Sequence, residues 1–257
     1  MSTDAREELQ KEIQRLYSTK GVKGEDNWGK VRNANCFERK TMEYDFGTRT
    51  SFDKKDQQAY ADLQASRGLS LDPDKSINEN LEWVEGESNN IPPNDLIRIQ
   101  EIDDLINLDS LENFIELGFR SPRLLKYYKQ AGKQCIGYDI ARVNVLAGQC
   151  LGYDCAVHDL SSDSDIQLKN KSLVAAYHVF EHLPDPMHSL KKVYNNLCED
   201  SYFHIEIPIE HVDDPVVRYA HCTSFRPGDL KNMLKEVGFK VVFNTVGGNI
   251  ERTLTKK

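Results

Sequence analysis

From residue 113 onward, short apolar runs alternate with segments in which apolar residues recur at helical spacing. The apolar runs predict strands near residues 113–117, 134–139, 153–157, 172–179, 201–207 and 240–246. The segments between them predict helices near residues 122–131, 142–151, 187–198 and 227–237. This alternation is typical of a parallel sheet with helices on both faces, so the sequence predicts an α/β fold with right-handed crossovers.

The end of the chain carries a different pattern. The run 240–246 is followed by Gly247-Gly-Asn249 and then by a second run, 250–255. Glycine and asparagine between two such runs are typical of a β-hairpin. We therefore expect the sheet to close with an antiparallel strand, which a dinucleotide-binding sheet does not need.

The first 110 residues or so lack the alternation of the later part. Apolar residues at helical spacing predict helices over residues 5–17, 52–67 and 94–108, the last with Asn94 as its N-cap. The face that this last helix should bury consists of Leu96, Ile99, Ile102, Leu105 and Ile106. The polar stretches 20–50 and 70–93 predict irregular structure. We expect a helical N-terminal appendage over residues 1–110, as packing or as a lid, and an α/β domain over residues 111–257.

The charge balance narrows the classes of partner. Acidic residues outnumber basic ones, 41 against 33, and the scattered basic residues form no patch for a phosphate backbone. A nucleic-acid substrate is therefore disfavoured. No apolar stretch approaches the ~20 residues that span a bilayer, and the charged start of the chain is unlike a signal peptide. We expect a cytoplasmic protein without membrane insertion, and the sequence leaves the oligomeric state open.

The cysteines indicate neither a disulfide framework nor a zinc site. None is spaced as CxxC, and several lie inside apolar runs where a thiol packs. We expect all of them to be reduced core residues: Cys36, Cys135, Cys150, Cys155, Cys198 and Cys222.

Two of the predicted strands end in residues suited to a nucleotide-type cofactor. Strand 113–117 runs into Gly118 ahead of a helix, and strand 134–139 ends in Asp139. In open parallel sheets such a glycine permits a tight turn, and an acidic residue about 20 positions on binds the ribose hydroxyls. A plain turn and a helix cap are the alternative roles for the two residues.

At these positions the chain resembles the class I S-adenosylmethionine (SAM)-dependent methyltransferases. The segments that carry the resemblance are Phe114-Ile-Glu-Leu-Gly118, Gly137-Tyr-Asp139, Val157-His-Asp-Leu160, Leu173-Val-Ala-Ala-Tyr-His-Val-Phe-Glu-His-Leu-Pro-Asp-Pro186, Glu206-Ile-Pro208, His221-Cys-Thr-Ser-Phe225 and Asp229-Leu230. The subgroup most alike contains sugar, small-molecule and ubiquinone-type O-methyltransferases. The resemblance covers about residues 111–254 and implies a Rossmann-like, seven-stranded sheet whose last strand is antiparallel.

The resemblance implies SAM as the cofactor, bound at the carboxyl edge of the sheet. The positions that match cofactor-binding residues are Glu116, Gly118, Phe119, Arg120, Asp139, Ile140, Asp159, Leu160 and His178. In this assignment Asp139 holds the ribose hydroxyls and Asp159 contacts the adenine amino group. The alternative for Asp159 is a polar turn ahead of a short helix.

The cofactor loop departs from the family pattern. The chain reads Gly118-Phe-Arg-Ser-Pro122, with Arg120 and Pro122 where the family has its second and third glycine. Ser121 as N-cap and Pro122 as the first helical residue would start the next helix and leave its amides for a carboxylate. Arg120 would pair with the methionine carboxylate of SAM.

The resemblance also indicates where a catalytic base would lie. His178 and His182 are the first candidates, Glu181 lies between them in the chain, and His221 is a further candidate. Some ubiquinone-type enzymes are thought to hold a divalent ion at the positions of His178, Glu181 and His182. We expect no metal, with Glu181 and His182 shaping the cleft by hydrogen bonds.

The string His178-Val-Phe-Glu-His182 also matches the HxxEH pattern of a zinc peptidase family. That pattern needs all five residues on one helix, so that both imidazoles face the metal. A predicted strand precedes the string, and Pro184 and Pro186 follow it. A zinc peptidase is therefore disfavoured.

Together these patterns predict a SAM-dependent O-methyltransferase for a small polar acceptor, such as a sugar or glycan hydroxyl. The alternative is a methyltransferase-like domain that has lost catalysis and serves in binding or scaffolding, its cofactor site closed by Arg120 and Pro122. A short-chain oxidoreductase is less consistent, because no Tyr-x-x-x-Lys pair follows the fourth strand.

Overall fold

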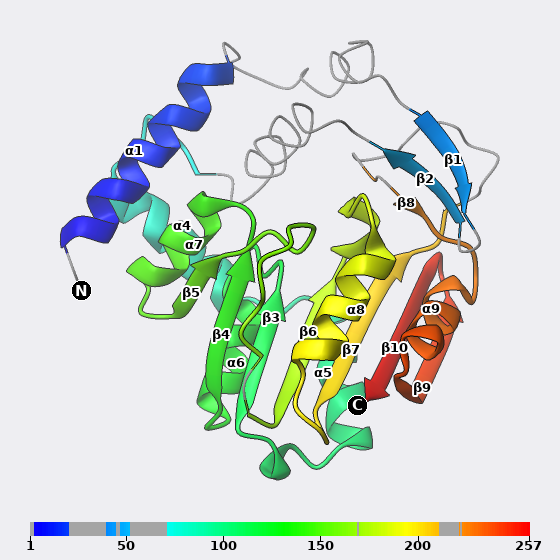
Figure 1. Cartoon of the computed structure of the whole chain (residues 1–257). Coiled ribbons are helices and arrows are strands. Elements are labelled where there is room, and N and C mark those ends of the chain that lie inside the picture. Colours follow the sequence, from blue (N-terminus) through cyan, green and yellow to red (C-terminus); the bar gives the residue numbers. More distant parts are fainter. Residues whose placement is uncertain are drawn as a thin grey trace.

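The computed structural model describes residues 3–20, 40–44, 47–51, 71–168, 170–210, 221 and 223–257. Its centre is a seven-stranded sheet with the order β5-β4-β3-β6-β7-β10-β9 (Figure 1). The strands are β3 (Asn113–Leu117), β4 (Gln134–Asp139), β5 (Asp154–Val157), β6 (Ser172–Tyr177), β7 (Tyr202–Pro208), β9 (Lys240–Gly247) and β10 (Ile250–Lys256). The first five pair in parallel, and β10 runs antiparallel between β7 and β9. The predicted sheet is confirmed.

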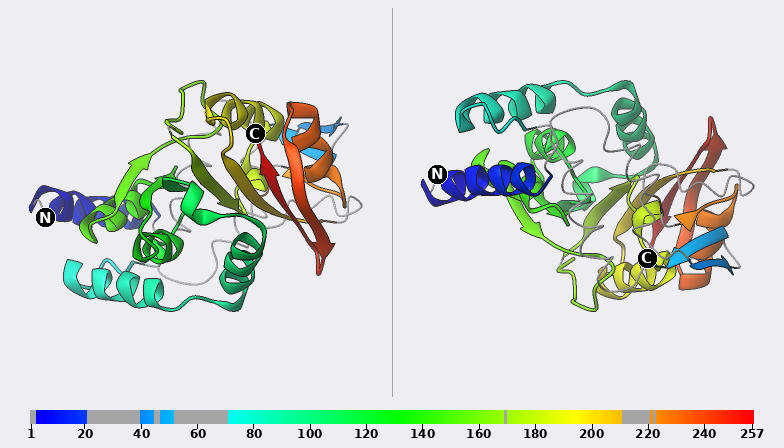
Figure 2. Two further views of the ribbon diagram at one scale, coloured as in Figure 1. Left: turned by 90° about the horizontal axis from the view of Figure 1, so that it is seen from below. Right: turned by 90° about the horizontal axis from the view of Figure 1, so that it is seen from above.

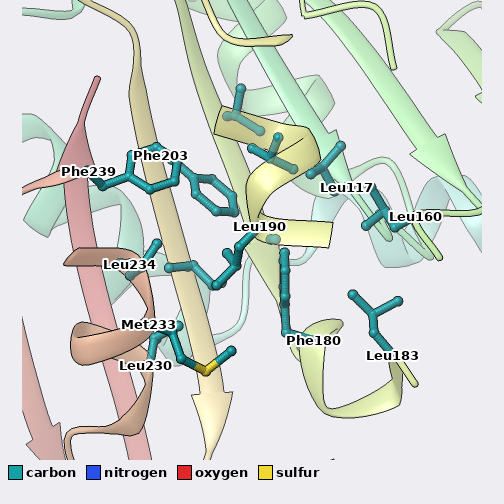
Figure 3. Packing of buried hydrophobic residues seen from close by; sticks show 14 of the residues in the cluster. Leu117, Leu160, Phe180, Leu183, Leu190, Phe203, Leu230, Met233, Leu234 and Phe239 are labelled. Atoms are coloured by element: carbon teal, nitrogen blue, oxygen red, sulfur yellow. The ribbon is translucent and has the colours of Figure 1, made fainter. Parts of the chain in front are cut away.

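Helices cover both faces of this sheet (Figure 2). On one face lie α8 (Pro186–Asn196) and α9 (Asp229–Val237), and on the other lie α5 (Pro93–Leu105), α6 (Arg123–Gln130) and α7 (Arg142–Cys150). Figure 3 shows Leu190 of α8 and Leu234 of α9 packed beside Phe203 of β7. The central strands are buried on both sides, which explains why their sequences are continuous apolar runs.

The N-terminal part packs on the edge of the sheet that carries α7. Helix α1 (Thr3–Lys20) confirms the helix predicted over 5–17, and Leu9 and Ile13 are buried with residues of α4 (Ile77–Asn89) and α7. Helix α4 corrects the prediction of irregular structure over 70–93. The missed signal is a capping box, in which the Ser76 side chain accepts from the Glu79 amide and the Glu79 side chain accepts from the Ser76 amide.

Helix α5 exists as predicted but differs in its start and in its buried face. It begins at Pro93 with Pro92 in the N-cap position, so Asn94 is not the cap. Leu96 and Leu105 are exposed. The buried residues of the helix are Asp95, Arg98, Ile99 and Ile102. Compared with the prediction, the helix is rotated about its axis so that Arg98 reaches the buried carboxylate of Glu206 on β7. The apolar pattern alone does not reveal this contact.

A small second sheet joins distant parts of the chain. Strands β1 (Lys40–Tyr44) and β2 (Gly47–Ser51) form a hairpin, and β2 pairs with β8 (Thr223–Ser224). This hairpin corrects part of the irregular structure predicted over 20–50; the rest of that stretch and the helix predicted over 52–67 lie outside the described residues. Figure 1 shows the hairpin beyond the end at which β7 finishes. The N-terminal part thus reaches the segment that follows β7.

Two further observations concern the membrane and the cysteines. None of their helices has the length and apolar character needed to cross a membrane. Their four cysteines are free thiols: Cys150 and Cys155 are buried, whereas Cys135 and Cys198 are half-buried. Cys36 and Cys222 lie outside the described residues.

Candidate active site

The loop between β3 and α6 is folded tightly against the turn that follows β6. Gly118 has a φ of +70°, and a Cβ at this position would lie 2.5 Å from Val179 Cγ2. Only glycine suits both this backbone angle and this space. Arg120, two residues on, has a φ of +44°, in the left-handed region that a non-glycine residue occupies only under strain. The loop thus keeps a glycine-type backbone at Arg120 without the glycine.

The start of α6 differs from the prediction. The helix begins at Arg123, with Pro122 in the N-cap position and no side-chain cap, so Ser121 is not the cap and Pro122 is not the first helical residue. The Ser121 hydroxyl is buried and has no hydrogen-bond partner among the described residues. A buried hydroxyl without a partner is unfavourable until a ligand or water supplies one. This group therefore fits a site for a polar ligand.

Asp139 holds the loop from the end of β4. Its buried carboxylate accepts hydrogen bonds from the Arg120 amide (2.9 Å), the Ala141 amide (2.7 Å) and Asn144 Nδ2 (3.2 Å). Burial raises the pKa of Asp139, while these donors oppose the rise. Asp139 is not the N-cap of α7, which is Ala141. The carboxylate therefore positions the loops after β3 and β4, and ribose hydroxyls would be additional partners.

The other residues matched to cofactor positions differ in how much surface they offer. Phe119 lies in the core, and a Cβ at Gly137 would be 2.7 Å from its ring. Leu160 is buried in the cluster beneath α8. Glu116 is also buried, and burial raises the pKa of its carboxyl well above the usual value. Ile140, directly after β4, stays half-buried. Phe119 and Leu160 therefore offer a ligand little more than their backbone.

Asp159 forms the polar turn that was the alternative to adenine binding. Its Oδ1 accepts hydrogen bonds from the Ser161 amide (2.8 Å) and the Ser161 hydroxyl (2.7 Å). Lys192 of α8 donates to the Ser162 carbonyl (2.7 Å) and holds the turn in place. The two roles are compatible, since one carboxylate oxygen can make the turn while the other faces a ligand.

His178 lies at the end of β6 between two buried carboxylates. Its φ of +56° is in the left-handed region, its Nε2 is 3.0 Å from Glu206 Oε1 and its Nδ1 is 3.4 Å from Glu181 Oε1. Burial disfavours the charged imidazole, but the carboxylates of Glu181 and Glu206 outweigh it and raise the pKa of His178 to about 9. His178 is therefore charged at neutral pH, which argues against the prediction that it acts as a base.

Glu206 on β7 links His178 to Arg98 of helix α5. Its fully buried carboxylate accepts from Arg98 at both oxygens and from Arg252 Nη1 (2.6 Å). Arg252 also binds both oxygens of Glu101 on α5 (2.5 and 2.6 Å). Burial would raise the pKa of Glu206, but His178 and Arg98 hold it well below its usual value. No site role for Glu206 was predicted from the sequence, because its cationic partners come from distant parts of the chain.

His204 makes the stability of this region dependent on pH. It is fully buried, and burial lowers its pKa although Glu101 opposes the shift. The Tyr177 hydroxyl lies 2.8 Å from Nδ1, and Nε2 lies 3.5 Å from Glu101 Oε2, with Arg252 and Glu206 nearby.

We expect the free energy of unfolding to fall as the pH drops below the unfolded-state pKa of about 6.5, by up to about 1.4 kcal/mol per pH unit from this residue. The folded protein binds fewer protons at His204 than the unfolded chain does, so acid favours unfolding. Urea denaturation at pH 7 and pH 5 measures the effect. The loss should be smaller in His204→Asn, and an equal loss in this variant would contradict the prediction.

Glu181, His182 and His221 come together beside His178. Glu181 and His182 lie in the turn η2 (Phe180–His182), and His221 lies ahead of β8. One potential ligand atom from each residue lies within 4.8 Å of the others. The rings of His182 and His221 meet edge to face with centroids 4.8 Å apart, and His221 Nδ1 is 2.8 Å from Glu210 Oε1. A strand-end turn and a remote loop thus build one cluster of acid–base groups.

This cluster suits a divalent cation as well as acid–base chemistry. Glu181 is buried, and its nearest cationic neighbours are His178 Nδ1 (3.4 Å) and His182 Nε2 (3.9 Å), both on the side of Oε1. Two imidazoles and one carboxylate are a ligand set for zinc and related ions. The metal ligands considered from the sequence were His178, Glu181 and His182. In the structure His221 takes the place of His178, which instead contacts Glu206.

The predicted site residues therefore fall into two groups at the same edge of the sheet. Gly118, Arg120 and Asp139 surround the ends of β3 and β4, whereas the histidines and Glu181 gather beyond β6 and β7. The missed residues are Arg98, Glu206 and Glu210. Glu210 follows the predicted strand 201–207 by three residues, and that position could have suggested a place at the carboxyl edge.

Comparison with known proteins supports the same fold and extends it to a family. A family model described as a methyltransferase domain matches residues 93–243, which is more than half of the chain. Among curated proteins, no sequence matches.

Solved structures of similar fold are numerous. A SAM-dependent methyltransferase from Mesorhizobium loti has a TM-score of 0.52 at 10% identity, covering 62% of this chain and 96% of its own. The PH0226 protein from Pyrococcus horikoshii has a TM-score of 0.51 at 13% identity, covering 64% and 92%. The cyclase SpnF has a TM-score of 0.52 at 11% identity, covering 74% and 86%. Because a cyclase shares this fold, the fold does not by itself determine the reaction.

The structure and the family match lead to the same conclusion. The structural observations are the strand order, the Gly118 turn and the carboxylate at the end of β4. SAM, the cofactor predicted from the sequence, is the cofactor of such domains. The chain belongs to the methyltransferase-domain family and has the class I, SAM-dependent methyltransferase fold.

Proposed function

We propose that this protein transfers the methyl group of SAM to a hydroxyl oxygen of a small polar acceptor, with a sugar or glycan hydroxyl as the first choice. The observation that carries the proposal is the cluster of Glu181, His182 and His221 beside the cofactor loop. It offers acid–base groups at the edge of the sheet where this fold binds its substrates.

The cofactor side of the proposal rests on Gly118, Arg120, Ser121 and Asp139. SAM, when bound, supplies an electrophilic methyl group on a positively charged sulfur. The orphaned Ser121 hydroxyl and the Arg120 side chain are suited to its carboxylate, and Asp139 to its ribose hydroxyls. Arg120 and Pro122 differ from the family glycines, yet the left-handed backbone at Arg120 keeps a glycine-type turn.

The acceptor side of the proposal rests on strand geometry. β3, β6 and β7 are adjacent, so the end of β7 lies about 10 Å from the Gly118 turn, at about 4.8 Å per strand. The segment from Val179 through η2 bridges this gap. Val179 occupies the space that a Cβ at Gly118 would need, and the His182 ring meets that of His221. An acceptor held near His221 would face a methyl group bound over β3 and β6.

His221 is the base in this proposal. His221 Nδ1 lies 2.8 Å from Glu210 Oε1, and this contact orients the ring. The imidazole would take the proton from the acceptor hydroxyl as the hydroxyl oxygen attacks the methyl group. His178 is charged and instead holds Glu181 in place, while His182 packs against the base.

Isothermal titration with SAM and with its demethylated product tests the cofactor assignment. We expect both to bind, and Asp139→Asn to weaken binding about 10- to 100-fold, since one or two charge-assisted hydrogen bonds are lost. Asp154 is exposed at the amino end of β5, whereas Asp139 lies at the carboxyl end of β4. Asp154→Asn is therefore the matched control and should bind SAM as the wild type does. Absence of heat with either ligand would favour the non-catalytic scaffolding domain instead.

A metal-assisted form of the reaction is the second candidate, favoured by the close approach of the potential ligand atoms of Glu181, His182 and His221. A divalent ion held by Glu181, His182 and His221 would lower the pKa of an acceptor hydroxyl. In this case we expect Mn²⁺ or Zn²⁺ to bind the metal-free protein, and Glu181→Gln to weaken binding about 10- to 100-fold.

Activity separates the two forms. If EDTA leaves methyl transfer unchanged, His221 acts as a base without metal. If EDTA abolishes transfer and Mn²⁺ or Zn²⁺ restores it, the histidines serve as ligands.

A further inference from the structure

A cavity of about 330 Å³ lies beyond the carboxyl end of β7, next to the histidine cluster. Its walls come from the segment after β7, the segment before α9 and the turn between β9 and β10. The residues that line it are Ile209, Glu210, Arg226, Pro227, Val246, Gly247, Gly248 and Asn249. A volume near the low end of the range for ligand sites suits a molecule about the size of one sugar ring.

Backbone hydrogen bonds hold these walls together. The Ile209 amide donates to the Asn249 carbonyl (2.8 Å), and the Glu210 amide donates to the Phe225 carbonyl (3.0 Å). Asp229 Oδ2 accepts from the amide (2.7 Å) and from Nε (3.4 Å) of Arg226. The cavity is therefore formed by three segments that are bonded to one another, as a preformed site requires.

Glu210 joins the cavity to the proposed base. Glu210 lines the cavity, and its Oε1 lies 2.8 Å from His221 Nδ1 while Oε2 accepts from the Ser224 hydroxyl (3.3 Å). His221 in turn touches His182. A molecule in the cavity that reaches Glu210 is thus next to the group that would remove its proton.

The lining has the chemistry of a site for a neutral, hydroxyl-rich molecule. Its two ionisable side chains, Glu210 and Arg226, carry opposite charges, and Arg226 already pairs with Asp229. No surplus of positive charge among the lining residues is left for a phosphate or a carboxylate. Ile209, Pro227 and Val246 offer an apolar wall, and Asn249 adds an amide. Vicinal hydroxyls suit the polar groups, and the C–H face of a sugar ring suits the apolar wall.

We propose that this cavity is the acceptor subsite and that it binds an uncharged sugar residue, one hydroxyl of which is directed past Glu210 toward His221. The inference rests on the proposed function and deepens it by naming the subsite and the charge class of the acceptor.

Backbone amide NMR of the full-length protein, with the demethylated SAM product present, tests the proposal. The probes are methyl glucoside and methyl galactoside as neutral sugars, glucose 6-phosphate and glucuronate as anions, and glucosamine as a cation. We expect the neutral glycosides to shift the resonances of Gly247, Gly248 and Asn249. Larger shifts from an anion or from glucosamine would overturn the charge class, and no shift from any sugar would overturn the subsite.

Filling the cavity gives a second, independent test. Gly247 lines the cavity and a Cβ there would meet no atom within 4 Å, so Gly247→Trp adds an indole at the cavity wall without disturbing the core. We expect Gly247→Trp to raise the KM for a sugar acceptor at least about 10-fold, or to weaken the glycoside-induced shifts by the same factor. Binding of the demethylated SAM product should be unchanged. Gly86→Trp, at an exposed and equally open position on α4, is the matched control.

The outcomes separate the inference from the proposed function. If the demethylated product binds and the neutral sugars act equally on wild type and Gly247→Trp, the subsite is wrong and the methyltransferase proposal stands. If the product does not bind, the proposed function fails, and shifts at residues 247–249 still report whether the cavity binds sugars.

Discussion

Arg98→Met is expected to lower the free energy of unfolding by about 3 to 5 kcal/mol, the usual consequence of removing one partner from a buried ion pair. Arg98 is buried, binds both oxygens of Glu206, donates to Asp95 Oδ1 (2.5 Å) and lies 4.2 Å from the centre of the Tyr177 ring. Methionine keeps most of the volume and none of the charge, so two buried carboxylates lose a cation. Urea denaturation in EDTA at pH 7 measures the difference.

Arg142→Met is the matched control for this prediction. Arg142 also pairs with a carboxylate, that of Glu8, but both side chains are largely exposed. Exposed pairs contribute about 0 to 1 kcal/mol, so this variant should unfold almost as the wild type does. Equal losses in the two variants would mean that the buried network adds no more to stability than a surface pair.

His221→Gln is expected to lower kcat about 100- to 10,000-fold, the range by which a positioned general base accelerates a reaction. Glutamine can keep a hydrogen bond to Glu210, but it cannot take a proton at neutral pH. Binding of SAM should be unchanged, because His221 lies beyond β7 and the cofactor loop lies beyond β3. Single-turnover methyl transfer to a sugar acceptor measures the step directly.

His188→Gln serves as the control for that variant. His188 is an exposed histidine of α8 outside the cluster, so its replacement should leave kcat unchanged. Wild-type turnover in His221→Gln would remove His221 from the catalytic role. A loss of turnover that occurs together with a loss of bound metal would favour the metal-assisted form.

The positions of Gly118 and Asp139 were predictable from the sequence. Each follows or ends an apolar run, and parallel strands bring their carboxyl ends to one edge. The roles of Ser121 and Pro122 were not predicted correctly, because a shift of one residue in the start of α6 changes what each of them contacts. The same limit applies to α5, where periodicity correctly predicted a helix but not its buried face.

The sequence by itself determined the strands and helices of the main sheet from residue 113 onward, the antiparallel close of that sheet and the glycine turn at residue 118, because each depends on residues that are neighbours along the chain. Only the tertiary structure decided that His178 is charged. Glu181 and Glu206 flank its imidazole and raise its pKa to about 9. Glu206 is far from His178 in sequence, and the effect of both carboxylates on a proton depends on distance and burial, which no local pattern encodes.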